Sequence, residues 1–392
     1  MHLKNCLPST TSTNVKRFFL IVSFLFLLLV SCNRERIEPK PNPDDDMNEV
    51  FVPAEKIEGR IALSYVTYYG KEIPDPTYLT HICYAFAELY VDNGMYRKFA
   101  LQGSQSRFED IMALKRSHPH LKILLGFTHT VENKDNTQQG GFSVTSATEA
   151  NRQAFAADCF AFVKEWDLDG IDIGWEFPGI SWSGHASDPK NDTRNHVLLM
   201  QQLRETLGPN YLITFPGYVM DAKQTTEGSR YIDLHAVAPY VDFVNIMTYD
   251  MDQAPNHHSA LEDKRAYWDC VRALNAYKAA GFPVEKMVLG IPFYGRISFS
   301  QNPSAVTYAQ IKKMDPATYV IDNWDPTASV PYVTIKNTGA FYCGYDNAAS
   351  IAIKGTWMLS MGMKGMMCWM YDGDDANGTL RKALWNAVMK PL

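Results

Sequence analysis

Two acidic residues share one face of a short apolar stretch, DGIDIGWEFPG at residues 169–179. In an extended strand alternate side chains face the same way, so Asp172, Gly174 and Glu176 lie on one face and the apolar residues between them on the other. Carboxyl groups at this spacing can donate and accept protons in acid–base catalysis. An interior carboxylate is costly to bury unless it is hydrogen-bonded or paired, which favours a functional role. The alternative is that both acids are satisfied structural groups.

A single strand is stable only within a sheet, and strand-like runs recur along the chain. Short apolar, β-branched or aromatic runs recur from residue 60 onward, separated mostly by amphipathic stretches such as NRQAFAADCFAFVKEW at 151–166. Strands that alternate with helices predict a parallel sheet, and eight such units predict an α/β fold, the (β/α)8 TIM barrel. Functional residues are then expected at the carboxyl ends of the strands. The eight runs begin at residues 60, 81, 122, 170, 211, 242, 287 and 365.

The gap before the last run is longer than the others and has its own signals. TYAQIKK, from residue 307, indicates a helix, while YVTIKN and AFYCGY, from residues 332 and 340, indicate strands. We therefore predict a small α+β insertion at 297–346, between strands seven and eight.

The composition is that of an ordinary globular protein. With 392 residues, 46% of them hydrophobic, the chain can bury a large core without disulfide or metal support. The net charge is −6, and it becomes −9 if residues 1–31, which carry three cations and no acid, are removed. This charge disfavours nucleic acid as a partner. The cysteines after Cys32 are scattered without CxxC spacing, so neither a disulfide framework nor a metal site is indicated, although a single bridge is left open.

The N-terminus has the features of a targeting segment. An uncharged run of thirteen residues at 18–30 follows three cations and is too short to span a bilayer comfortably, which predicts a secretory signal over 1–31. The run ends in LVSC, which resembles the lipobox of bacterial lipoproteins, where the cysteine is lipidated. We expect a lipidated Cys32, a flexible tether over 32–55 and the catalytic barrel over 56–392. This predicts a lipoprotein anchored to a membrane of the bacterial cell envelope, periplasmic or at the cell surface; a plain secretory signal or an uncleaved anchor is the alternative.

The acidic strand resembles the DxxDxDxE signature of glycoside hydrolase family 18, the chitinase family. Asp169, Asp172 and Glu176 match the signature, and Gly174 stands where its third Asp belongs. LTHICYAFA resembles the family's second strand, VNIMTYD its sixth, LGIPFYGR its seventh and KGMMCWMYDGD its eighth, in order over residues 60–376. The resemblance implies a retaining glycosidase that cleaves β-1,4 bonds between N-acetylglucosamine units. Its partners would be chitin, chitooligosaccharides or glycans that contain N-acetylglucosamine.

In this family the substrate assists its own cleavage. The resemblance implies that Glu176 protonates the glycosidic oxygen and later deprotonates water, while the substrate's acetamido oxygen attacks the anomeric carbon. Tyr249 would donate its hydroxyl to the acetamido carbonyl, and Asp172 completes the implied catalytic set. No metal or organic cofactor is required. The implied sugar-binding residues are Asp250, Arg296 and Trp369, the last stacking under a sugar ring. Further candidates for the same pocket, with core packing an equal alternative for each, are Tyr65, Phe86, Met247 and Tyr294.

The chain departs from the family pattern in two places. With Gly174 instead of Asp, Glu176 lacks a neighbouring charge that would help to hold its proton, and the acetamido group lacks an acceptor, which costs about 100- to 1,000-fold in turnover. Glycine is also expected to leave a void, open to water, a rotated Asp172 or a carboxylate from another strand. In the third strand, GFTHT at 126–130 replaces SxGG and a Trp, which predicts weak binding on the product side. We interpret His129 as a polar loop residue rather than an acid.

Three functions fit these residues. The first is a hydrolase of chitin or chitooligosaccharides, slow or with an altered substrate; the second is a non-catalytic carbohydrate-binding protein; the third is an endo-β-N-acetylglucosaminidase that acts on N-glycans. Glu176 favours the first function and Gly174 the second, while the WEFP, MxYD and YxR segments resemble the chitinase branch more than the third. The sequence leaves the oligomeric state open.

Overall fold

The structure is a computed structural model that describes residues 53–136, 141–180, 186–219 and 232–391. The predicted signal and the lipidated Cys32 lie outside these residues, as does most of the tether. No helix in the described ranges is long and apolar enough to cross a membrane.

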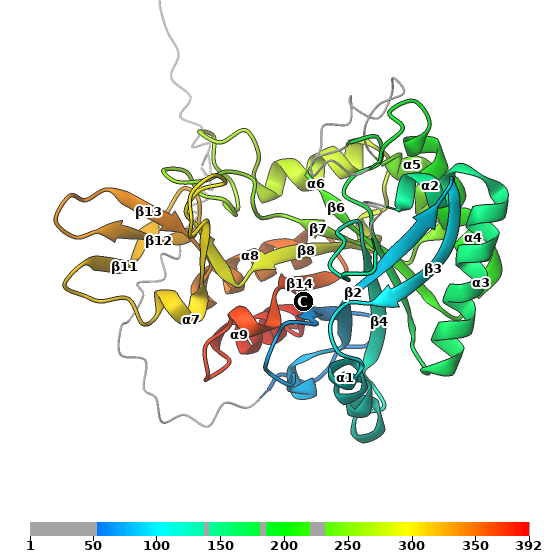
Figure 1. Ribbon diagram of the computed structural model, residues 1–392. Coiled ribbons are helices and arrows are strands. Elements are labelled where there is room, and N and C mark those ends of the chain that lie inside the picture. Colours follow the sequence, from blue (N-terminus) through cyan, green and yellow to red (C-terminus); the bar gives the residue numbers. More distant parts are fainter. Residues whose placement is uncertain (1–52, 137–140, 181–185, 220–231, 392) are drawn as a thin grey trace, which may run out of the picture. The chain divides into compact units, whose positions relative to one another are not determined.

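A ring of parallel strands forms the centre of the described chain (Figure 1). The strands are β1 (Ile61–Thr67), β2 (His81–Asp92), β4 (Lys122–Thr128), β5 (Gly170–Gly174), β6 (Leu212–Tyr218), β7 (Phe243–Met247), β8 (Met287–Pro292) and β14 (Gly365–Trp369). Their order is β1-β14-β8-β7-β6-β5-β4-β2, and the ring closes because β1 pairs with both β14 and β2. Each predicted run supplies one strand, so the (β/α)8 TIM barrel is confirmed.

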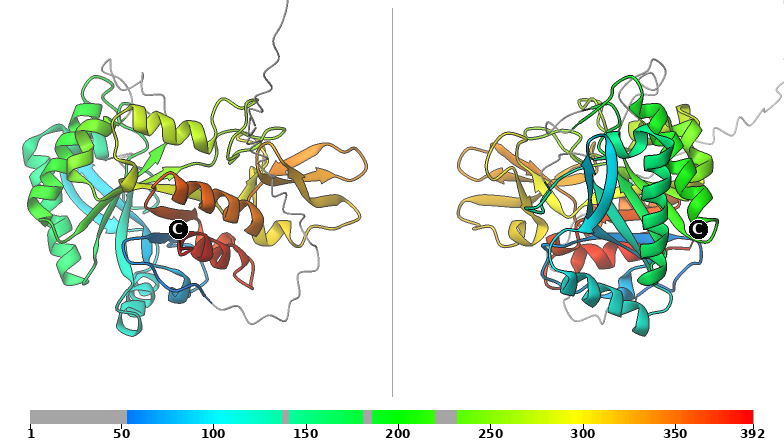
Figure 2. Two further views of the ribbon diagram at one scale, coloured as in Figure 1. Left: turned by 180° about the vertical axis from the view of Figure 1, so that it is seen from behind. Right: turned by 45° about the vertical axis from the view of Figure 1, so that its right-hand side comes forward.

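Helices cover the outside of the ring, as both views in Figure 2 show. They are α1 (Gln105–Ser117), α2 (Phe142–Ala147), α3 (Glu149–Glu165), α4 (Asp192–Leu207), α5 (Leu234–Val237), α6 (Cys270–Ala279), α8 (Ala348–Ser360) and α9 (Thr379–Val388). Short 3-10 helices span Pro76–Tyr78, Ala238–Tyr240, Val284–Lys286 and Tyr371–Gly373.

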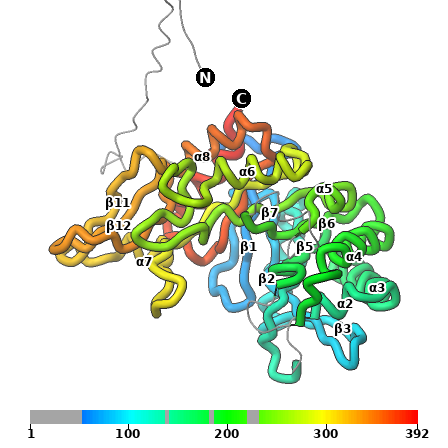
Figure 3. Tube along the Cα trace, turned by 90° about the horizontal axis from the view of Figure 1, so that it is seen from above, coloured from blue at the N-terminus to red at the C-terminus, as the bar shows by residue number. Residues whose placement is uncertain are grey.

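Helix α3 shows how the sequence places these helices. The Thr148 side chain accepts a backbone hydrogen bond at the helix start, which caps a helix N-terminus. Phe155, Cys159 and Val163 then recur at helical spacing and are buried. The helix predicted at 151–166 is therefore confirmed, and the view from above in Figure 3 places α3 and α4 outside β5 and β6.

Strand β5 has the two faces that its alternation predicts. Asp172 is fully buried inside the ring, where it meets Tyr65 of the opposite wall. Ile171, Ile173 and Trp175 belong instead to the apolar core between the ring and its helices. The side chains that could do chemistry therefore project toward the barrel interior.

The main sheet also contains a strand that was not predicted. Strand β3 (Met95–Leu101) pairs antiparallel with the extended end of β2. The two-residue connection is Asn93-Gly94, and both residues have positive φ, 49° and 74°. Asn-Gly between two strand-like runs is a strong signal for such a hairpin, so the sequence carried enough information to predict it.

The segment 297–346 contains most of a second sheet, which joins the chain between β8 and β14 (Figure 1). Its strands and helix are β9 (Tyr294–Arg296), β10 (Ala305–Thr307), α7 (Tyr308–Ile311), β11 (Tyr319–Asp325), β12 (Val330–Ile335) and β13 (Phe341–Gly344). The predicted helix and both predicted strands are present, while β9, β10 and β11 were not predicted. Strand β9 pairs with both β10 and β13, so this sheet begins immediately after barrel strand β8.

All the cysteines in the described ranges are free thiols, and all are buried. The single disulfide that the sequence left open is not formed among them. These residues are Cys83, Cys159, Cys270, Cys343 and Cys368.

Candidate active site

A cavity of about 540 Å³ lies at the carboxyl ends of the barrel strands. The sequence-predicted residues that line it are Tyr65, Phe86, Glu176, Met247, Tyr249, Asp250, Tyr294, Arg296 and Trp369. Asp172 does not line the cavity but is hydrogen-bonded to the Tyr65 hydroxyl, which does. The predicted site residues of the described chain thus gather at one end of the barrel, where barrel enzymes carry their chemistry.

Asp172 is held by donors from three other strands. Its carboxylate accepts hydrogen bonds from the Tyr65 hydroxyl at 2.9 Å, the Thr214 hydroxyl at 2.5 Å and the Asn245 amide at 3.3 Å. Burial raises the pKa of Asp172, and the bonds from Thr214 and Tyr65 partly oppose that rise. Because these donors already engage both carboxylate oxygens, a rotation of Asp172 toward the cavity would break them.

Glu176 reaches the cavity from the end of β5. Its side chain is partly exposed, but the surrounding protein keeps most bulk water away. This burial, followed by repulsion from the Asp172 and Asp250 carboxylates, raises the pKa of Glu176 to about 7. The carboxyl group therefore keeps a proton to near neutral pH. Gly174 supplies no carboxylate beside Glu176, but burial and the charges of Asp172 and Asp250 help to hold its proton instead.

Asp250 and Arg296 form a two-point ion pair at the cavity wall. The Arg296 Nε donates to one Asp250 oxygen at 2.8 Å and Nη2 to the other at 2.7 Å. Burial alone would raise the pKa of Asp250, but hydrogen bonds with His258 and Arg296 outweigh it and hold that pKa well below its usual range. Asp250 is thus a fixed anion in the wall, whereas Glu176 is a proton carrier.

The aromatic members of the site line the same cavity as Glu176. The Trp369 ring lies nearly parallel to Phe86 at a centroid distance of 5.9 Å and at 5.6 Å from Tyr65. Burial, followed by the charges of Glu176 and Asp250, raises the pKa of Tyr249 well above its ordinary value. Its hydroxyl therefore stays protonated, and in the structure it donates a long, weak hydrogen bond to Met367 Sδ at 4.0 Å.

Gly174 lies where strands β4 and β5 approach closely. A Cβ atom added there would stand 2.3 Å from the Phe127 carbonyl oxygen, a contact that real side chains do not make. In the sheet register Gly174 is opposite Thr128, and Phe127 is opposite Ile173. The void expected at this glycine is therefore wrong: neighbouring backbone already occupies the space. The missing carboxylate reflects how the two strands pack, as well as which residue is encoded.

The cavity is also lined by residues that the sequence did not assign to the site. Tyr69, just past β1, and the β4 end residues Thr128, His129 and Thr130 line it, as do Ser304–Thr307 and Gln310 from the second sheet region. Tyr69 follows the carboxyl end of a predicted strand, so the rule that barrel sites lie there could have identified it. His129, interpreted from sequence as a polar loop residue, lies at the cavity, although this position assigns it no role.

Asp169, the first acid of the motif, lies at the opposite end of β5. Its carboxylate accepts from the Ile123 backbone at 2.8 Å and pairs with Lys115 at 2.9 Å and Lys122 at 3.0 Å. It therefore ties the start of β5 to helix α1 and strand β4, and takes no part in the cavity.

A closed (β/α)8 barrel with a protonatable carboxyl, a fixed ion pair and aromatic walls at its carboxyl end is the arrangement expected of a barrel glycosidase. The chain belongs to glycosyl hydrolases family 18, whose pattern matches residues 62–374. Its homologues include chitinases, which supports glycosidase chemistry of the chitinase-like kind.

Individual relatives span a range of described functions. Chitinase A1 from Niallia circulans is 29% identical, over 69% of this chain and 43% of that protein. The oviduct-specific glycoprotein of Homo sapiens is 26% identical, over 78% of this chain and 47% of that protein. A solved family 18 N-acetylglucosaminidase from Paenibacillus barengoltzii is 26% identical with a TM-score of 0.69, and the match covers 84% of this chain and 99% of that one. The chain spans less than half the length of the first two relatives.

Proposed function

We propose that this protein hydrolyses β-1,4 bonds between N-acetylglucosamine units with retention of configuration, using the substrate's acetamido group as the nucleophile. Glu176 acts as the acid that protonates the leaving oxygen and then as the base that activates water. Tyr249 donates to the acetamido carbonyl, Asp250 and Arg296 bind sugar hydroxyls, and Trp369 stacks against the apolar face of a ring. Asp172 contributes by orienting the Tyr65 hydroxyl and by its charge beneath Glu176.

The observation that carries this proposal is the position and pKa of Glu176. A carboxyl group that titrates at about 7 in a cavity beside a protonated tyrosine is suited to general acid catalysis near neutral pH. A protein that only binds sugar has no need to keep such a group. The absent third Asp removes an acceptor for the acetamido N–H, so we propose turnover about 100- to 1,000-fold below that of a site with the complete motif.

The direct test is hydrolysis of N-acetylchitotetraose by the domain from residue 50, followed by chromatography of the products. Release of shorter oligomers with retained anomeric configuration supports the proposal. Binding of the tetraose without cleavage, even at high enzyme concentration, would replace it with the alternative of a non-catalytic sugar-binding protein. Gly174 favours that alternative, since the close approach of β4 leaves the acetamido nitrogen without its usual carboxylate partner.

Cleavage of N-glycans is a third outcome, tested by incubating the same domain with a glycoprotein that carries high-mannose chains. Release of glycans there, with the tetraose left intact, would move the proposed substrate from chitooligosaccharides to N-glycans.

The pH profile should follow the protonation of Glu176. Only the protonated carboxyl can donate to the leaving oxygen, and burial raises its pKa to about 7. We therefore expect kcat to fall by about tenfold per pH unit above pH 7. It should return to its full value when the pH is lowered below 7, where Glu176 is protonated. Initial rates on the tetraose between pH 5 and pH 9 check this. A rate that stays constant to pH 9 would assign the proton to another group.

We propose further that the protein acts outside the cytoplasm, anchored by a lipid on Cys32. The proposal depends on the uncharged run at 18–30 and the LVSC sequence that follows it. Growth of an expressing cell with a labelled fatty acid would test it: the label should enter the native chain and not the Cys32→Ser variant.

A further inference from the structure

The Asp250 backbone has an unfavourable conformation that contacts from other residues must stabilise. Its φ is +54°, in the left-handed region that residues with side chains rarely adopt, although Asp tolerates it better than most. At this turn the chain leaves β7 and turns the Asp250 carboxylate toward Arg296. The position of the ion pair in the cavity wall therefore depends on whatever holds this turn.

His258 makes three contacts with the turn. Its Nδ1 lies 3.3 Å from the Asp250 backbone nitrogen and 3.4 Å from the Asp250 carboxylate, and its carbonyl oxygen accepts from the Met251 backbone at 3.1 Å. Nδ1 can accept from the backbone N–H or, when it carries the proton, donate to the carboxylate, so the ring serves one partner in each tautomer. The ring also packs against Tyr294, with centroids 5.1 Å apart.

His258 does not itself line the cavity. It is 1% exposed, and it contacts the wall residues Asp250 and Tyr294 from behind. Nε2 is buried with no hydrogen-bond partner in the described part of the chain, so the polar contacts of the imidazole are those on its Nδ1 side. Burying Nε2 without a hydrogen-bond partner costs stability. A role for the Nδ1 contacts in positioning Asp250 in the cavity wall would explain why a histidine stands here.

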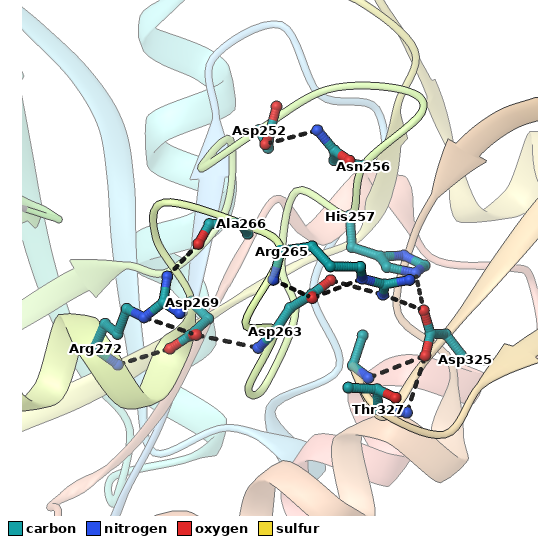
Figure 4. Close-up of polar contacts among 11 residues, drawn as sticks. Asp252, Asn256, His257, Asp263, Arg265, Ala266, Asp269, Arg272, Asp325 and Thr327 are labelled. Carbon is teal, nitrogen blue, oxygen red and sulfur yellow. Dashed lines mark hydrogen bonds and ion pairs between the residues drawn. The ribbon is translucent and has the colours of Figure 1, made fainter.

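The neighbours of His258 fix the loop that carries it. Figure 4 shows the contacts on one side: His257 Nε2 lies 3.1 Å from the Asp325 carboxylate on β11, and Arg265 bridges Asp325 and Asp263. The loop between β7 and α6 is therefore tied to the second sheet.

On the other side, the loop is tied to helix α8. The Ser259 hydroxyl donates to Asp346 at 2.7 Å, and the buried Lys354 ammonium bonds the Ser259 carbonyl and the same carboxylate. His258 thus lies between two anchors, so the loop is still held on one side when the other anchor is weakened.

We propose that His258 is a positioning residue that fixes the Asp250–Arg296 pair for sugar binding. The sugar-binding part of this inference rests on the proposed function. The backbone nitrogen and the carboxylate of Asp250 both contact Nδ1. A different side chain with a polar atom at the δ position should therefore be able to replace the imidazole.

A pair of substitutions separates the polar contact from the packing. His258→Phe keeps a ring against Tyr294 but has no polar atom, whereas His258→Asn places an amide at the δ position and gives up the ring. We expect KM for N-acetylchitotetraose to rise by about tenfold in His258→Phe and to stay within about threefold of the native value in His258→Asn. Ser259→Ala is the matched control, since it loosens the same loop at another anchor: its thermal stability should fall while KM stays unchanged.

A second readout needs no sugar. Arg296 lines the cavity, so phenylglyoxal can modify it, and peptide mass spectrometry gives the rate of modification. The rate should rise at least about threefold in His258→Phe, where the carboxylate partner is no longer held, and remain near native in His258→Asn and Ser259→Ala.

KM and the Arg296 modification rate together separate a failure of the proposed function from a failure of the positioning role. If the native domain neither cleaves nor binds the tetraose, the proposed function fails, and the Arg296 modification rates still decide whether His258 positions the pair. Equal modification rates and equal KM in the Phe and Asn variants would overturn the positioning role. A KM increase in Ser259→Ala as large as in His258→Phe would overturn it too, because general loosening of the loop would then explain the effect.

Discussion

Replacing Glu176 with glutamine is expected to reduce hydrolysis of N-acetylchitotetraose by about 1,000-fold and to leave its binding nearly unchanged. Glutamine has the size and the neutral charge of the protonated carboxyl, which is the form that burial favours up to a pH of about 7. It cannot transfer a proton to the leaving oxygen or remove one from water, and general acid–base catalysis contributes about 100- to 10,000-fold. Calorimetric titration for binding and product release for rate measure the two effects separately.

Asp169→Asn provides the matched control within the same motif. Its carboxylate pairs with Lys115 and Lys122 at the other end of β5, far from the cavity residues in the register of the strand. The variant should lose stability because the ion pairs of residue 169 with Lys115 and Lys122 are lost, and it should keep its kcat. If Glu176→Gln retained more than a tenth of the native rate, Glu176 would not be the acid, and the proposed mechanism would fail at its first step.

Much of the fold could be predicted because each barrel strand has a local sequence signal. Each strand is a short apolar or β-branched run, and α3 repeats Phe155, Cys159 and Val163 at helical spacing. The strand ends then fix where the site must lie, and the resemblance to glycoside hydrolase family 18 assigned Glu176, Tyr249 and the other predicted residues to it. Strand β3 was missed although its Asn93-Gly94 turn is a local signal of the same kind.

What could not be predicted depends on contacts between distant segments. His258 follows Asp250 by eight residues in an irregular loop, and its place behind Asp250 is set by anchors at Asp325 and Asp346, far along the chain. The proton affinity of Glu176 could not be predicted for a similar reason. A motif reveals a missing charge, whereas burial, the larger effect here, emerges only when the whole cavity is assembled.

The Gly174→Asp substitution, which writes the complete motif into the sequence, is expected not to restore chitinase turnover. A stabilising carboxylate in its proper place would raise the rate by about 100- to 1,000-fold. Here any Cβ at residue 174 stands 2.3 Å from the Phe127 carbonyl oxygen, and that oxygen belongs to the backbone of β4 rather than to a flexible side chain. We expect the strands to be forced apart, with a loss of stability of about 1–3 kcal/mol and no gain in rate.

Gly174→Ala separates the backbone contact from the new charge, because it adds the same Cβ without a carboxylate. Urea unfolding of both variants should give similar losses of stability if the approach of Phe127 is the cause. A stable Gly174→Asp variant that cleaves the tetraose at least 100-fold faster would show that β4 yields easily and that the side chain alone limits the native rate. If instead both variants are destabilised and slow, the strand packing itself excludes the third carboxylate. Restoring it would then require changes in β4 as well as in β5, so the departure from the family motif is a property of two strands and not of one residue.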